Sequence, residues 1–95
     1  MAKTRVVNRY RESWEVSIGR PGPFGNPFYL PRGSSLEERA ACIAKFKFYF
    51  ERRVREEPEF RAALETLRGK VLGCYCKPLA CHGDVIVEYL EGGSR

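Results

Sequence analysis

One apolar repeat in the middle of the chain constrains the fold more than any other feature. After a capping-box pair, Ser35 and Glu38, apolar residues recur at steps of three and four positions, the spacing of one helical face. These residues are Leu36, Ala40, Ile43, Phe46, Phe50 and Val54. Pro58 ends the pattern, because proline disfavours helical geometry in the residue before it and suits the first turn of a new helix. The sequence predicts a long amphipathic helix to Glu57 and a second helix from Pro58.

Short segments rich in β-branched residues lie on both sides of this helical region. Residues 5–8 and 15–18 are expected to form two strands. Residues 70–76 read as a third, buried strand, with Gly73 where backbone or ligand approaches closely. A last helix is expected from residue 81 to Leu90. Because strands joined by helical crossovers lie parallel, we predict the α/β class: a single small domain whose mainly parallel sheet has at least three strands, with about three helices.

The length of the chain fits one domain. Ninety-five residues, 43% of them hydrophobic, exclude two independent cores and argue against wholesale disorder. We expect one domain over residues 1–95, with its core at about 5–90 and a flexible tail at 91–95. No stretch approaches the roughly 20 apolar residues that span a bilayer, and no secretory signal is present, so a cytoplasmic location without a membrane partner is expected. An uncovered sheet edge leaves a homo-oligomer open.

The charge of the chain points weakly to an anionic partner. The formal net charge is +5, and the excess lies mainly in residues 1–20. Such a balance suits an anionic small molecule or nucleic acid, although many soluble proteins carry as much. Basic residues between positions 3 and 11 interleave with Tyr10 and Trp14, which could together contact phosphates and stack on bases. The sequence favours the alternative, a solvated face whose two aromatic rings turn toward the core.

The densest group of reactive side chains is a C-x-C-x4-C-H constellation formed by Cys74, Cys76, Cys81 and His82. In a reducing compartment it favours metal binding or thiol chemistry over disulfides. Four soft or borderline ligands within nine residues match the count of a Cys3His zinc site, so zinc is one candidate cofactor. The spacing fits less well, because adjacent Cys81 and His82 point in different directions at a helix start.

Two other interpretations of this cluster stay open. In one, Cys81 and His82 lie at a helix N-terminus, where the helix dipole lowers the pKa of the Cys81 thiol and free N–H groups can bind a phosphate or carboxylate. In the other, the cysteines pack as small hydrophobes and Asp84 is favoured in the first turn simply by the dipole. Cys42, which has no chemical neighbour in the sequence, is expected only to pack.

The segment of residues 19–27 holds three glycines and three prolines, so it must be a shaped loop. It matches neither a P-loop nor a dinucleotide fingerprint. Gly25 can let the backbone approach an anion, Arg20 adds a charge, and Asn26 can read a carbonyl or amide edge. A rigid connection whose phenylalanines plug the core is the equal alternative.

Three motifs follow strands: Asn8 ends the first, the Gly-Pro loop follows the second, and the cysteine cluster follows the third. In open α/β sheets the ligand crevice lies at these carboxyl ends. We therefore predict a small or degenerate enzyme acting on a nucleotide, nucleoside or nucleic-acid base. The alternative is a zinc- or packing-stabilised module that binds nucleic acid or protein without catalysis. Expected catalytic residues are Cys81, His82 and Asp84; expected substrate-binding residues are Asn8, Arg20, Gly25, Asn26 and Lys77; expected metal ligands are Cys74, Cys76, Cys81 and His82.

Several motifs together resemble a known family. They are Val6-Val7-Asn8, Ile18-Gly19-Arg20-Pro21, Gly25-Asn26-Pro27-Phe28, Leu67-Arg68-Gly69-Lys70 and the run from Leu72 to Asp84. From Val6 to about Tyr89 the chain is similar to the domain of unknown function 4326 family, small bacterial and bacteriophage proteins in which tryptophan often stands at the position of Tyr75. The resemblance implies a stand-alone domain, in the host-cell cytoplasm where a phage encodes it, and it implies no particular activity.

Overall fold

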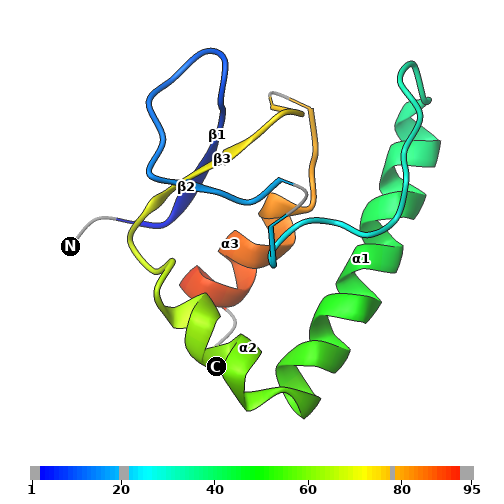
Figure 1. Cartoon of the computed structure of the whole chain (residues 1–95). Coiled ribbons are helices and arrows are strands. Elements are labelled where there is room, and N and C mark those ends of the chain that lie inside the picture. The colour runs from blue at the N-terminus through cyan, green and yellow to red at the C-terminus, as the bar shows by residue number, and fades with distance from the viewer. Residues whose placement is uncertain (1–2, 20–21, 78, 93–95) are drawn as a thin grey trace.

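The computed structural model describes residues 3–19, 22–77 and 79–92. The elements follow in the order β1 (Arg5–Asn8), β2 (Val16–Ser17), α1 (Leu36–Glu56), α2 (Pro58–Glu65), β3 (Val71–Cys74) and α3 (Gly83–Gly92) (Figure 1). The strands of this described part form one parallel sheet in the order β1-β3-β2. The predicted α/β class, with a parallel sheet of three strands and with three helices, is confirmed for a single small domain.

Helix α1 begins where the capping box places it. The Ser35 hydroxyl accepts a hydrogen bond from the Glu38 N–H at 3.0 Å, and the Glu38 carboxylate accepts one from the Ser35 N–H at 2.7 Å. Phe46 and Phe50 of the apolar face are buried, whereas Leu36 is 74% exposed. Leu36 is exposed because the first turn of α1 lies beside the preceding loop and beyond the other helices (Figure 1).

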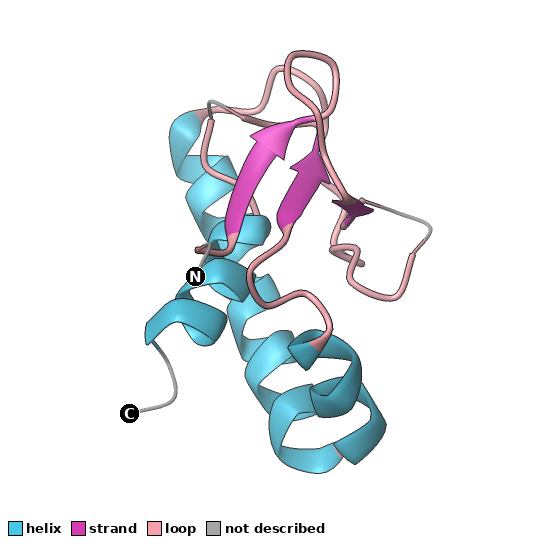
Figure 2. Ribbon diagram, turned by 90° about the vertical axis from the view of Figure 1, so that its left-hand side faces the viewer, coloured by secondary structure: helices cyan, strands magenta, loops and turns pink. Residues whose placement is uncertain are grey.

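The connection between β1 and β2 contains no helix. Both strands run parallel to β3 on opposite sides of it, so residues 9–15 must carry the chain back to the start of the sheet (Figures 1 and 2). The side chains of this connection press on β3: a Cβ atom at Gly73 would lie 2.7 Å from Arg9 Cγ and 2.9 Å from Trp14 Cγ. Gly73 is therefore closely approached, but by side chains of the β1–β2 connection and not by the backbone or ligand that the sequence predicted.

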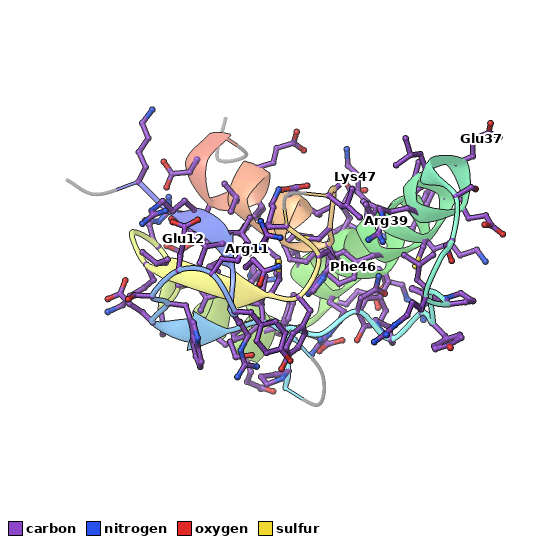
Figure 3. The ribbon with its side chains drawn as sticks, turned by 90° about the horizontal axis from the view of Figure 1, so that it is seen from above. Arg11, Glu12, Glu37, Arg39, Phe46 and Lys47 are labelled. Atoms are coloured by element: carbon purple, nitrogen blue, oxygen red, sulfur yellow. The ribbon has the colours of Figure 1, made fainter. Side chains whose placement is uncertain are left out.

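The opposite face of β3 belongs to the hydrophobic core. Leu72 and Cys74 are buried among residues of β2, α1, α2 and α3. Helix α3 packs tightly here, since a Cβ at Gly83 would lie 2.7 Å from Ile18 Cδ1. Seen from above, Phe46 of this core lies on α1, away from Arg11 and Glu12 on the β1–β2 connection (Figure 3).

Helix α3, the last element of the described chain, contacts the residues just before β1. The Glu91 carboxylate accepts a hydrogen bond from the Thr4 N–H at 2.8 Å. Residues 91 and 92 therefore belong to the helix, two residues into the segment expected as a tail, and residues 93–95 lie outside the described residues. Among the helices that the structure describes, none has the length and apolar character needed to cross a bilayer.

Candidate functional site

A cavity of about 370 Å³ lies at the carboxyl ends of β2 and β3, between Gly19, residues 26–32, the first half of α1 and the cysteine segment of residues 74–76 and 80–82. All four cysteines of the chain line it, together with His82 and Asn26. We call this cavity the crevice. The Gly-Pro loop and the cysteine cluster therefore meet at the predicted edge of the sheet, as their positions after two parallel strands required.

Cys74, at the end of β3, and Cys81, just before α3, form the closest pair in the crevice. Their sulfur atoms lie 3.6 Å apart, and both residues are buried. The hydrogen bond from Cys81 lowers the pKa of Cys74 to about 6, against the opposing effect of burial and with help from nearby N–H groups and the Lys77 charge.

The same hydrogen bond raises the pKa of Cys81, and burial and the Cys74 charge raise it further. The expectation of a lowered pKa at Cys81 is therefore wrong. The helix start does not act on Cys81 alone, because the two cysteines titrate as a coupled pair. The hydrogen bond that Cys81 donates favours the thiolate form of Cys74 and the thiol form of Cys81.

His82 is held between the end of β2 and α1. Its Nε2 lies 2.7 Å from the Ile18 carbonyl oxygen, which can only accept a hydrogen bond, so Nε2 carries a proton. The imidazole and the Phe46 ring pack edge to face, with ring centroids 5.1 Å apart. The ring is thus fixed in the wall of the crevice.

Lys77 and Asp84 form an ion pair beside the backbone of Cys81, outside the crevice. The Lys77 ammonium and the Asp84 carboxylate are 2.5 Å apart, and the second carboxylate oxygen accepts a hydrogen bond from the Cys81 N–H at 3.1 Å. Neither residue lines the crevice. The structure gives Asp84, expected to be catalytic, contacts that hold Cys81 at the start of α3.

Asn8 ties two loops together. Its amide donates to the Lys77 carbonyl at 2.7 Å, and its side-chain oxygen accepts from the Tyr10 N–H at 2.8 Å. It reaches the cysteine segment, as expected for a shared sheet edge, but it does not line the crevice. Gly25 is buried in a turn, its N–H 3.2 Å from the Gly22 carbonyl, while Arg20 lies outside the described residues.

Asn26 does reach the crevice, and it does so together with Cys42. The Asn26 amide donates to Cys42 Sγ at 3.5 Å, and its oxygen accepts from the Phe28 N–H at 2.9 Å. Cys42, expected only to pack, therefore faces the crevice beside a predicted substrate-binding residue. Sixteen positions separate the two residues, so no local motif could have joined them.

Two arginines that the sequence assigned to no site also line the crevice. Arg32 is exposed, and Arg39 of α1 donates a hydrogen bond to the Ala80 carbonyl at 3.3 Å. Arg39 thus contacts the backbone of the cysteine segment and brings positive charge to the cavity.

The donors for a zinc ion are only partly gathered. Cys74 and Cys81 lie in contact, but among the described residues no three His, Cys, Asp or Glu side chains are arranged to hold a metal ion. A tetrahedral site would require Cys76 and His82 to turn toward the pair. Zinc stays a prediction.

The sequence pattern of the family described as "Domain of unknown function (DUF4326)" matches residues 2–92. The chain belongs to this family. A relative from Enterobacteria phage T4, named "Uncharacterized 12.4 kDa protein in nrdA-td intergenic region", is 45% identical over 87 residues, which cover 92% of this chain and 77% of that protein. No solved structure matches the chain. The resemblance found in the sequence motifs is thereby confirmed, together with a phage relative.

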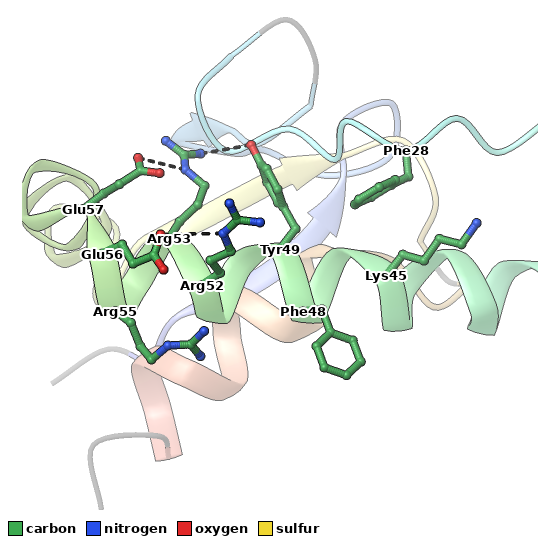
Figure 4. Close-up of a pocket in the computed structure, with 9 residues that line it drawn as sticks. All are labelled: Phe28, Lys45, Phe48, Tyr49, Arg52, Arg53, Arg55, Glu56 and Glu57. Carbon is green, nitrogen blue, oxygen red and sulfur yellow. Dashed lines mark hydrogen bonds and ion pairs between the residues drawn. The ribbon is translucent and has the colours of Figure 1, made fainter.

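A larger hollow of this DUF4326 domain, of about 830 Å³, follows the other half of α1 (Figure 4). None of the cysteines, His82 or Asn26 lines it. Two of its three arginines already meet carboxylates, with Arg53 3.1 Å from Glu57 and Arg52 3.6 Å from Glu56. The crevice, although smaller, is therefore the better candidate site.

The aromatic residues of the β1–β2 connection do not turn toward the core. Tyr10 is 82% exposed and Trp14 is 38% exposed. The prediction of a solvated face with buried rings is wrong here, because the core face of this DUF4326 sheet is already filled by the helices and the connection lies on the opposite face.

Proposed function

We propose that this DUF4326 domain is a small thiol-dependent enzyme that acts on a nucleotide, nucleoside or nucleic-acid base bound in the crevice. The observation that carries the proposal is the Cys74–Cys81 pair, two sulfurs 3.6 Å apart in the wall of a cavity of about 370 Å³. A cavity of this volume suits a small ligand.

The crevice offers groups that suit such a ligand. Arg32 and Arg39 supply positive charge for a phosphate. Asn26 keeps one amide hydrogen and one oxygen lone pair beyond its contacts with Cys42 and Phe28, enough to meet the edge of a base. Aromatic and aliphatic side chains, among them Phe28, line the remaining wall.

The cysteine pair supplies the chemistry. The Cys74 thiolate forms a carbon–sulfur bond with an electrophilic ring carbon, and the π-electron pair of that carbon moves onto the ring. The Cys81 thiol then gives its proton to the neighbouring ring carbon and keeps the negative charge. In the second half of the cycle the Cys81 thiolate takes a proton from that same carbon, the ring double bond forms again and the Cys74 thiolate leaves. The net change is exchange of the hydrogen on that carbon, and both cysteines return to their starting states. Asp84 and Lys77 act as positioning residues, because they hold the backbone that presents Cys81.

Turnover of a panel of nucleotides, nucleosides and bases in deuterated water, followed by chromatography and mass spectrometry, tests this function. The wild-type protein is expected to convert at least one member, and Cys74→Ser to lose at least a hundredfold in rate. Cys42→Ser, a matched change in the same crevice, should keep most of the activity. Equal rates in wild type and Cys74→Ser, or no conversion and no covalent adduct across the panel, would contradict it.

The Asn26→Ala variant separates binding from folding. A substrate-orienting residue should lose ligand affinity while the protein melts close to the wild-type temperature. Early melting with intact ligand binding would instead assign Asn26 to the turn that its oxygen caps at Phe28.

A zinc-stabilised binding module is the second candidate, and one observation favours it. Two thiolates on a tetrahedral zinc ion, each about 2.3 Å from the metal, lie about 3.8 Å apart, close to the 3.6 Å between Cys74 and Cys81. Elemental analysis of protein purified without added metal or chelator decides between the candidates. Stoichiometric zinc that disappears in Cys76→Ser would support the module, and metal-free folded protein would reject it.

A further inference from the structure

Three aromatic rings and one guanidinium form a row on the face of β3 that carries no core residues. The Arg9 guanidinium lies 4.4 Å from the centroid of the Trp14 ring and 4.9 Å from that of Tyr75, and the Tyr10 ring follows 5.6 Å beyond Tyr75. We call Arg9, Tyr10, Trp14 and Tyr75 the platform. Its rings are 82%, 38% and 46% exposed for Tyr10, Trp14 and Tyr75.

Hydrogen bonds of Arg9 and close packing on Gly73 hold the platform in place. Arg9 donates hydrogen bonds to the Ser17 hydroxyl at 3.1 Å and to the Tyr75 hydroxyl at 2.5 Å. The missing Cβ of Gly73 leaves the space into which Arg9 and Trp14 settle. The row is therefore preorganised, and Tyr10 remains largely exposed while Trp14 and Tyr75 are about half buried.

The platform continues into the crevice. Tyr75 belongs to both, and Gly19, whose Cβ would lie 2.9 Å from the Tyr75 ring, also lines the crevice. One strand accounts for this continuity: Tyr75 follows β3 directly after Cys74, whose sulfur lies on the opposite side in the crevice wall. A ligand stacked on Tyr75 would therefore lie at the edge of the crevice that the thiol pair also lines.

The charge around the platform suits a polyanion. Arg9 belongs to the row and Arg11 follows on the same exposed connection, while Arg5 pairs with Glu12 at 3.4 Å. The other carboxylate of this connection, Glu15, accepts the Val71 N–H at 2.8 Å. Exposed rings beside arginines are the combination with which proteins stack the bases of single strands and follow their phosphates.

We propose that the platform binds single-stranded nucleic acid by base stacking and presents one base of the strand to the crevice. The inference rests on the proposed function and specifies its substrate class as a base within a strand. Single strands expose the faces of their bases, whereas a duplex hides them in its own stack.

Fluorescence anisotropy with labelled single-stranded DNA, single-stranded RNA and the matching duplex tests the platform. Tyr10→Ala, at a residue too exposed to affect folding, is expected to weaken single-strand binding about tenfold. Phe48→Ala, equally exposed at 80% but on α1, is the matched control and should bind as the wild type does. The emission of Trp14, the single tryptophan of the chain, should be quenched by a stacked base.

Single-strand binding that Tyr10→Ala and Phe48→Ala leave equally strong would overturn the proposal, as would tighter binding of the duplex. The comparison of DNA with RNA shows which sugar the site accepts. Conversion of free nucleotides that depends on Cys74, without any binding of single strands, would leave the proposed function standing and reject the platform. Single-strand binding that depends on the platform, without conversion of any nucleotide or base, would support the platform and reject the proposed function.

Discussion

The two faces of β3 differ in what their side chains do. On the core face, Leu72 is fully buried and Cys74 lies against Cys81 in the crevice wall. On the other face, Gly73 leaves space for Arg9 and Trp14, and Tyr75 remains 46% exposed. Alternation along one short strand thus separates the buried cysteine pair from the more exposed platform. The domain keeps both sites within a few residues of each other.

The core face should carry most of the stability. Leu72→Ala removes a fully buried side chain, so we expect a loss of about 2–5 kcal/mol in the free energy of unfolding. Urea denaturation measures it. Tyr75→Ala, on the opposite face, should cost less than half as much, and equal losses for the two variants would break the distinction between the faces.

The two tightly packed glycines sharpen the same distinction. Gly73→Ala forces a Cβ to within 2.9 Å of Arg9 and Trp14, and Gly83→Ala does the same against Ile18 and Val6. Overpacking of this kind costs about 1–3 kcal/mol in each case. Only Gly73→Ala should also shift the Trp14 emission. A shift of equal size in Gly83→Ala would show that the two faces are not independent.

The charge on the cysteine pair should follow pH in a defined direction. Ultraviolet absorbance is expected to show one thiolate that appears as the pH rises through about 6, the pKa of Cys74. Below that pH the thiolate, and with it the proposed nucleophile, is lost. In Cys81→Ala the hydrogen bond disappears, so the midpoint should rise toward the ordinary cysteine value of about 8.5.

Cys42→Ala is the control for this titration, because Cys42 lies in the crevice without contributing to the Cys74 shift. Its midpoint should match that of the wild type. If the wild-type protein shows no thiolate below pH 8, the lowered pKa assigned to Cys74 is contradicted.

Substitutions in the larger hollow along α1 should have the smallest effect on stability and on ligand binding. Arg52→Ala breaks an exposed ion pair with Glu56, so a loss of about 0.3–0.5 kcal/mol is expected in thermal unfolding. Ligand binding and turnover should not change. A clear loss of either one would move the site from the crevice to this hollow.

Local sequence patterns predicted the elements well. The capping box at Ser35, the break at Pro58 and the β-branched segments placed helices and strands, because each depends on residues a few positions apart. They also predicted that the Gly-Pro loop and the cysteine cluster would meet at one edge of the sheet. The topology rule for parallel strands supplied that step.

Contacts between distant segments could not be predicted in this way. Cys42 meets Asn26, and Arg39 meets the cysteine segment, only because α1 packs beside both residues 26–32 and the cysteine segment. The opposite pKa shifts of Cys74 and Cys81 depend on a contact of 3.6 Å between their sulfur atoms, which the spacing of the two residues in the sequence does not reveal. The exposure of Tyr10 and Trp14 depends on which face of the sheet the helices occupy.

The most direct test of the crevice is a titration of isotopically labelled protein with nucleoside monophosphates, followed by the chemical shifts of backbone amides. We predict saturable shifts concentrated at Gly19, Asn26, Cys42 and Cys74–Cys76, with little change near Arg52 and Arg53. Shifts concentrated along the second half of α1, which lines the larger hollow, would contradict the assignment of the crevice as the functional site. So would the absence of saturable shifts with any nucleotide.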